Sequence, residues 1–163
     1  MTISKTLKSM DFKQLWSLLW LCVRHPLYIV PTIKATRKTV AVCNEEFGKA
    51  HHKNGRANAF RHALWNALIV HHCLQWYPKA MRARAWAKKF TDWHEDFSVN
   101  QDLARAMDVH NNRVGRIFVA QHLEVSEGQL IQLVMKMIPL SRKRKTTQEM
   151  QEFPNQLVHI EDV

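Results

Sequence analysis

Glycine and proline are scarce in this sequence, whose 163 residues contain only 4 Gly and 5 Pro. A β-sandwich or barrel needs turn signals about every 8–12 residues, so this scarcity argues against both. No segment shows the alternation of polar and apolar residues that is typical of a half-buried strand. The sequence therefore predicts an all-α fold, a single compact bundle of five or six helices.

Cysteine is also rare, with one residue each at Cys22, Cys43 and Cys73. The number is odd and no C-x-x-C pair is present, which argues against a disulfide framework and against a thiolate zinc site. Free thiols of this kind are typical of a reducing compartment, and we expect a cytoplasmic protein, with peripheral association with the membrane as an option.

Long hydrophobic runs are absent as well. The most apolar stretch, residues 15–23, is too short to span a bilayer, which takes about 20 residues. Lysines precede this stretch as in a signal peptide, but no small-residue cleavage site follows it, so we expect a helix that is retained.

Six helices are expected from periodicity and from capping signals at Asp11 and at Ser126 with Gln129. We expect three parts of the chain: N-terminal helices packed on the core (1–47), a core helical domain with the polar site (48–140) and a flexible tail that is basic and then acidic (141–163). The expected helices cover residues 11–24, 31–47, 56–75, 79–97, 102–122 and 126–140.

Acidic residues are outnumbered, with 14 Asp and Glu against 24 Lys and Arg, for a formal net charge of +10. Such an excess favours an anionic partner: a phosphate-bearing substrate, a nucleic acid or an anionic membrane surface. Residues 12–30 combine Trp16 and Trp20 with basic side chains, as interfacial helices do. The same segment could instead pack on the core or bind a protein partner, and the sequence leaves the oligomeric state open.

The helix expected over 56–75 is apolar on nearly all sides, which is typical of a buried helix. Asn58, His62 and Asn66 nevertheless recur every four residues and form one polar line along it. A buried polar group without a partner costs about 1–3 kcal/mol, so other polar side chains must face this line.

The next two helices offer such side chains. In the helix over 79–97, His94 falls among inward-facing aromatic residues, whereas Glu95 lies about 100° further round and would reach a site only at the edge of a cleft. In the helix over 102–122, Asp108, Asn111 and Asn112 share an arc with Gly115, while His110 lies nearly opposite. A helical glycine costs about 1 kcal/mol relative to alanine, which indicates a close approach there.

Three helices thus direct histidine and carboxylate side chains toward one interior. Such a set on facing helices is typical of a metal site, with zinc or another divalent ion held by His62, His94 and Asp108. The same residues without metal could perform acid–base catalysis, and a purely structural hydrogen-bond network is the other alternative. The candidate catalytic residues are His62, His94, Glu95, Asp108 and His110; the candidate substrate-binding residues are Asn58, Arg61, Asn66, Asn111 and Asn112.

Two motifs within residues 48–120 carry a resemblance: N-A-F-R-H-A at 58–63 and D-x-H-N-N-x-x-G at 108–115, with W-H-E at 93–95 between them. The sequence resembles an uncharacterised bacterial domain family that occurs at the C-terminal ends of polymorphic toxins and in short stand-alone proteins. The resemblance implies that the candidate residues of these motifs match the family's pattern, and it favours a toxin-like hydrolase acting on a cell component.

The interpretation that these observations favour is a metal-assisted hydrolase of a phosphodiester-type substrate, either a phospholipid or a nucleic acid. The alternative is a non-enzymatic basic helical module that binds an anionic membrane surface, a nucleic acid or a protein, with the His, Asn and Asp cluster as a structural network.

Overall fold

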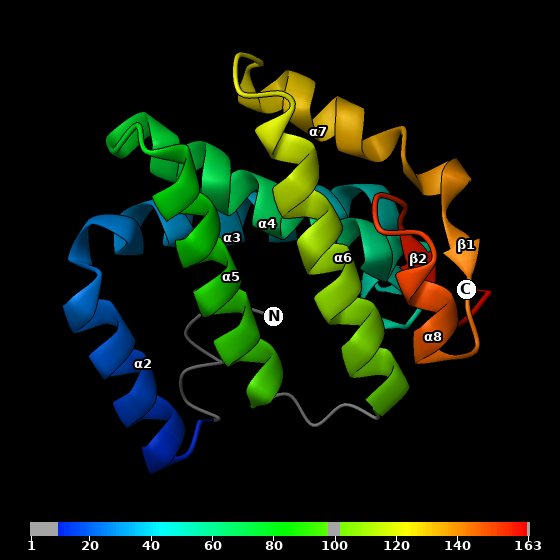
Figure 1. Cartoon of the computed structure of the whole chain (residues 1–163), viewed down its shortest axis with the longest axis horizontal. Helices are drawn as coiled ribbons and strands as arrows, with labels where there is room; N and C mark the ends of the chain where they lie inside the picture. Colours follow the sequence, from blue (N-terminus) through cyan, green and yellow to red (C-terminus); the bar gives the residue numbers. More distant parts are fainter. Residues whose placement is uncertain (1–9, 98–101, 163) are drawn as a thin grey trace.

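The computed structural model of the chain describes residues 10–97 and 102–162 (Figure 1). Within these residues almost all regular structure is helical, which confirms the predicted all-α fold. The α-helices are α2 (Phe12–Arg24), α3 (Ile29–Phe47), α4 (Arg56–Trp76), α5 (Ala80–Asp96), α6 (Asp102–Ala120), α7 (Glu127–Met135) and α8 (Thr147–Gln151). Short 3-10 turns cover Pro26–Tyr28, Ala50–His52 and Ile138–Leu140, and two strands, β1 (Arg142–Lys143) and β2 (Val158–His159), pair in parallel.

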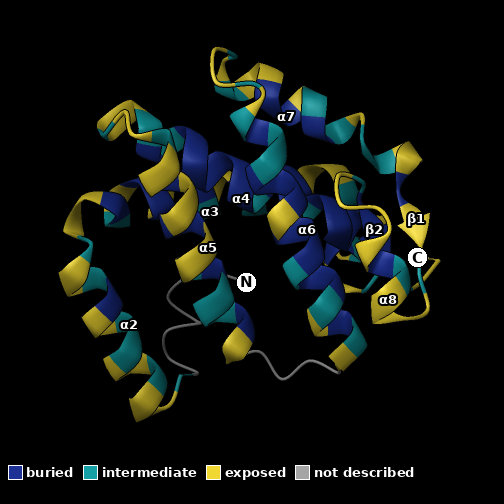
Figure 2. Cartoon of the chain, in the orientation of Figure 1, coloured by how far each residue is buried: buried dark blue, intermediate teal, exposed yellow. Residues whose placement is uncertain are grey.

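Helix α4 is the centre of the molecule, and α3, α5, α6 and α7 all pack against it. It is buried along most of its length, whereas the other helices alternate buried and exposed positions (Figure 2). Its core side chains Phe60, Leu64 and Leu68 are fully inaccessible to solvent. The apolar character of this helix on all sides explains its position, because only a helix surrounded by others can bury every face.

Helices α4 and α6 cross at Gly115. A Cβ atom at this position would lie 2.1 Å from the carbonyl oxygen of Ala63, so only glycine permits the contact. The close approach that a helical glycine indicated is therefore confirmed, and its cause is the backbone of α4.

The predicted helix starts are well reproduced where capping residues mark them. Asp11 and Gln14 form a capping box at the start of α2, and Ser126 and Gln129 form one at the start of α7. Helix α3 begins two residues before Pro31, which occupies its first turn, and α7 ends at Met135. The turn expected before Asp102 falls at 98–101, outside the described residues.

The segment after residue 140 differs from the flexible tail that its composition suggested. It contains β1, α8 and β2, and its side chains Met150, Leu157 and Val158 are buried. Asn111 of α6 holds β2 by accepting a hydrogen bond from the Val158 amide (3.0 Å) and donating one to the Val158 carbonyl (2.9 Å). Apolar residues within a polar segment, rather than its overall charge, determine that it packs.

The length and hydropathy of the helices bear on whether the described part of the chain crosses a membrane. None of the helices there combines the length and the apolar character that crossing a bilayer requires.

Candidate functional site

Three lines of polar side chains meet in the interior between α4, α5 and α6, and they form what we call the polar cluster. In each line the residues are four apart, so they share one face of their helix. The lines are Asn58, His62 and Asn66 on α4; Thr91 and Glu95 on α5; and Asp108, Asn112 and Arg116 on α6. All eight side chains are buried.

His62 lies at the centre of the polar cluster, between two carboxylates. Its Nδ1 atom is 3.4 Å from Oε1 of Glu95, and its Nε2 atom is 3.2 Å from Oδ1 of Asp108. One ligand atom from each of these three residues lies within 4.8 Å of the other two. His62, Glu95 and Asp108 therefore form a buried group that could hold a metal ion.

The proton of the His62 ring can be assigned from its partners. A guanidinium is always a donor, and Nη2 of Arg61 lies 2.8 Å from His62 Nε2, so this nitrogen accepts. The proton is then on Nδ1, which donates to Oδ1 of Asn112 at 3.1 Å. Arg61 also donates to Oδ1 of Asn58 at 3.2 Å, which fixes the guanidinium beside the ring.

Asn112 links His62 to Glu95 and to the rest of the cluster. Its Nδ2 atom donates to Oε1 of Glu95 at 3.1 Å, and its Oδ1 atom also accepts from Nδ2 of Asn66 at 2.6 Å. Oδ1 of Asn66 in turn accepts from Nη1 of Arg116 at 2.6 Å and from Oγ1 of Thr91 at 3.2 Å. This network fixes the orientation of His62 and Glu95, as outer hydrogen bonds do in metal and acid–base sites.

Burial shifts the protonation of every titratable group at the centre. It raises the pKa of Glu95 to about 7, against the hydrogen bond from Asn112, which lowers it. The pKa of Asp108 is also raised to about 7, by burial and then by the negative charge of Glu95. Burial, followed by the positive charges of Arg61 and His94, lowers the pKa of His62 well below its usual value. A neutral imidazole thus lies between two carboxyl groups that titrate near neutral pH.

These shifts predict how stability depends on pH in the metal-free protein. Because folding raises the pKa of Glu95 from 4.5 to about 7, the fold favours its protonated form. The stability that protonated Glu95 contributes is fully present below about pH 4.5, and it is lost as the pH rises through 7. We expect the free energy of unfolding of the wild type, relative to that of Glu95→Gln, to fall between pH 4.5 and 8.

Urea titrations of both proteins in the presence of a chelator would measure this difference. The buried histidines have lowered pKa values, so they make the protein more stable as the pH rises, opposite to Glu95. Both proteins contain these histidines, so their effect largely cancels in the difference between wild type and variant. A difference that stays constant or grows with pH would contradict the raised pKa of Glu95.

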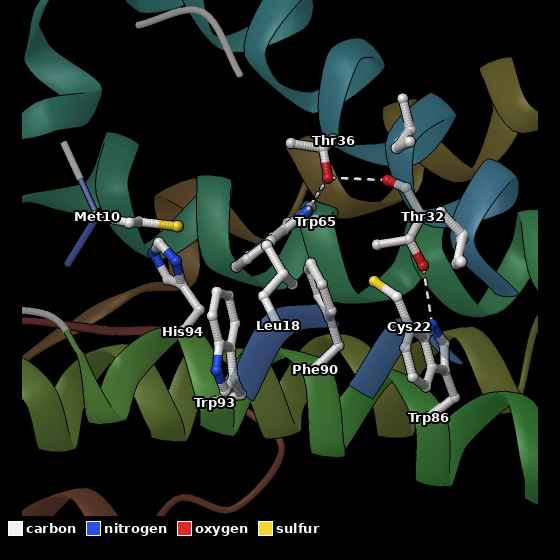
Figure 3. Close-up of a pocket in the computed structure, with 12 residues that line it drawn as sticks. Met10, Leu18, Cys22, Thr32, Thr36, Trp65, Trp86, Phe90, Trp93 and His94 are labelled. Carbon is white, nitrogen blue, oxygen red and sulfur yellow. Dashed lines mark hydrogen bonds between the residues drawn. The ribbon is translucent and has the colours of Figure 1, made fainter. Parts of the chain in front are cut away.

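His94 lies outside the centre of the polar cluster, although the sequence favoured it over Glu95. Its half-buried ring packs edge-on against Trp65, with the ring centres 5.1 Å apart, and lies beside Met10 in an apolar cavity (Figure 3). The aromatic face of α5 is covered by α2 and α3, so it does not mark the side of the polar cluster. Glu95 therefore takes the position among the candidate metal ligands that we expected for His94.

His110 and Asn111 are directed toward the C-terminal segment. The Nε2 atom of His110 is 2.8 Å from the carbonyl oxygen of Gln156, and Asn111 forms the two hydrogen bonds with the Val158 backbone described above. Their buried side chains thus hold the C-terminal segment at Gln156 and Val158, and the catalytic role of His110 and the substrate-binding role of Asn111 stay predictions. Packing of residues 141–162 created this second set of partners.

Thr91 and Arg116 are the two members of the polar cluster that the sequence analysis did not identify, and Arg116 is the charged one. It is only 7% exposed. Burial lowers its pKa to about 10, which leaves it charged at neutral pH and able to offset the carboxylates. The four-residue spacing from Asp108 through Asn112 to Arg116 is the signal that could have identified it.

Residues 19–142 match the family described as a domain of unknown function, DUF6973, and the chain belongs to this family. The matched range contains every residue of the polar cluster. Neither the curated proteins nor the solved structures yielded a match to the chain.

Proposed function

We propose that this domain is a hydrolase in which His62, Glu95 and Asp108 hold a divalent metal ion and act on a phosphodiester-type substrate. The observation that carries the proposal is the buried placement of one imidazole and two carboxylates with their ligand atoms within 4.8 Å of one another. A mixed nitrogen and oxygen donor set suits zinc or manganese. A bound metal lowers the pKa of its water toward about 7 and polarises a phosphoryl oxygen.

Positive charge beside the cluster supports a substrate that carries phosphate. Arg61 contacts both His62 and Asn58, and a guanidinium pairs well with phosphate oxygens. The formal charge of the whole chain, +10, favours the approach of an anion. The motif resemblance to toxin C-terminal domains further supports a hydrolase that acts on a cell component.

One contact favours a second candidate, hydrolysis without metal. Arg61 already places a cation 2.8 Å from His62 Nε2, the nitrogen that faces Asp108. In this alternative, Glu95 or Asp108 exchanges a proton with water, because a carboxyl group with a pKa of about 7 is populated in both forms near neutral pH. His62 and Asn112 then orient the carboxyl groups.

Metal binding tests the first candidate directly. We expect protein stripped by a chelator to bind about one Zn²⁺ or Mn²⁺ per chain in calorimetry, and Glu95→Gln and His62→Gln to weaken binding about 100-fold or more. His122→Gln is the matched control, because His122 contacts the Phe118 carbonyl outside the polar cluster and should leave binding unchanged. Equal binding by the wild type and the two cluster variants would refute the metal site.

Turnover of bis(4-nitrophenyl) phosphate, a general phosphodiester, then separates the alternatives. Activity that disappears with a chelator and returns with metal supports the first candidate. Activity that persists in the chelator but falls about 100-fold or more in Glu95→Gln supports the metal-free candidate. A folded protein with neither metal binding nor turnover of phosphodiesters would assign the polar cluster to the non-enzymatic alternative.

A further inference from the structure

An apolar cavity of about 240 Å³ lies between α2 on one side and α3, α4 and α5 on the other (Figure 3). Its walls include the rings of Trp65, Trp86, Phe90 and Trp93, and α2 contributes Leu18. The volume corresponds to roughly eight water molecules at about 30 Å³ each. A cavity with such walls favours an apolar guest over water.

The polar atoms of the three tryptophans are already used within the protein. Nε1 of Trp65 donates to Thr36, Nε1 of Trp86 donates to Thr32, and Nε1 of Trp93 donates to Ser17, all at 2.8–2.9 Å. The indole rings are therefore held in place by hydroxyl groups and present their carbon surfaces to the cavity. This arrangement suits a hydrocarbon chain, which needs no hydrogen bonds.

One end of the cavity is close to the polar cluster. Figure 3 shows His94 at the end opposite Cys22 and Trp86. Arg61 lies one helical turn before Trp65 on α4, and its charge acts on both His94 and His62. Nε of Arg61 is buried and has no hydrogen-bond partner among the described residues. A cation with a spare donor near His94, which lines the cavity, suits a ligand with an anionic head and an apolar tail.

The outer face of α2 indicates where such a ligand would come from. Phe12, Trp16, Trp20 and Val23 are each more than half exposed, although they are large and apolar. Arg24 stacks over Trp20 at 4.3 Å, so a basic group borders this surface. Exposed tryptophan and basic side chains on one short helix are typical of a helix that lies at an anionic membrane surface.

We propose that the cavity takes an acyl chain of an anionic phospholipid drawn from the membrane on which α2 lies, with the lipid phosphate at the Arg61 and His94 end. That this lipid is also the substrate rests on the proposed hydrolase function, since its phosphodiester would then lie next to His62, Glu95 and Asp108. The acyl chain extends along the tryptophan rings toward Cys22.

Binding can be measured without turnover. The probe is lysophosphatidylglycerol with a brominated acyl chain, kept below its micelle concentration with a chelator present, because bromine quenches tryptophan fluorescence on contact. We expect saturable quenching in the full chain and binding at least about tenfold tighter than that of the uncharged monoacylglycerol with the same chain. Glycerol phosphate, which has no chain, should compete only weakly.

Two variants fill the cavity from α2: Cys22→Phe and Leu18→Trp. Each should weaken binding of the lysolipid at least about tenfold while its circular dichroism and metal binding stay as in the wild type. The matched control is Val23→Phe, which adds the same ring to the exposed face of α2 and should leave binding unchanged. Two positions are used so that a folding defect in one variant leaves the other informative.

Wild-type affinity in both folded cavity variants would overturn the inference, as would equal affinity for the charged and uncharged probes. A concentration-dependent dimer that binds no probe would also overturn it, since a second copy would then cover the α2 face. If the cavity variants lose lipid binding but the metal-loaded wild type hydrolyses no phosphodiester, the lipid site stands and the hydrolase proposal fails.

Discussion

Asp108→Asn is expected to abolish hydrolysis while leaving the protein at least as stable as the wild type near pH 8. Asparagine keeps the size of the side chain and can donate to His62 Nε2, which lies 3.2 Å from Oδ1 of Asp108. It removes the charge that would bind a metal or exchange a proton, so activity should fall about 100-fold or more. It also removes a carboxylate whose charge is unfavourable in the fold, because burial and then the nearby charge of Glu95 raise the pKa of Asp108.

The expected result for Asp108→Asn is therefore a loss of activity together with a melting temperature equal to or above that of the wild type at pH 8. Thermal unfolding and turnover measured on the same samples would check it. Asp96→Asn is the matched control, because Asp96 is exposed and pairs with Arg105 at the surface. Retained activity together with a melting temperature lowered by more than about 3 °C, or roughly 1 kcal/mol, would assign Asp108 to structure.

Gly115→Ala is expected to cause the largest loss of stability. The new Cβ would lie 2.1 Å from the Ala63 carbonyl oxygen and 2.8 Å from the Ala63 Cα, so α6 must move away from α4. Overpacking of this kind costs about 3 kcal/mol, which outweighs the gain of about 1 kcal/mol in helix propensity. The net loss of about 2 kcal/mol corresponds, for a chain of 163 residues, to a melting temperature lower by roughly 4–8 °C.

Activity should fall with stability in Gly115→Ala, since α4 and α6 position His62 and Asp108 and a displacement of about 1 Å can cost about 100-fold in rate. Gly128→Ala is the control: a Cβ at this exposed position of α7 meets no atom within 4 Å, so we expect no loss of stability and a gain of up to about 1 kcal/mol from helix propensity. Equal melting temperatures for the two variants would show that α4 and α6 separate more easily than their contact indicates.

The architecture could be predicted from local patterns because each pattern acts within one helix. Asp11 and Ser126 each mark a helix start through a hydrogen bond three residues away, a contact that needs no tertiary partner. The line through Asn58, His62 and Asn66 likewise follows from helical spacing, and all three side chains are buried in the polar cluster.

The choice between His94 and Glu95 was decided only by tertiary structure. Both residues lie on α5, about 100° apart, and α5 is covered on two sides, by α2 and α3 and by α4 and α6. Amphipathic periodicity identifies one apolar face and cannot say which neighbouring helix covers it. Here the aromatic face lines the cavity, whereas Glu95 shares the buried face of α5 with the small residues Ala83 and Ala87, which lie twelve and eight residues before it.

The partners of Arg116 and of Asn111 likewise depend on segments far away in the sequence, which periodicity within one helix does not reveal. By itself the sequence determined an all-α chain with a buried polar helix, a glycine contact and a positive net charge. The packing of α6 against α4 and α5 decided that Arg116 would be buried beside Asn66, and the return of residues 156–159 decided that Asn111 would bind the Val158 backbone. A buried polar side chain requires a partner, but only the three-dimensional fold determines which partner lies within reach.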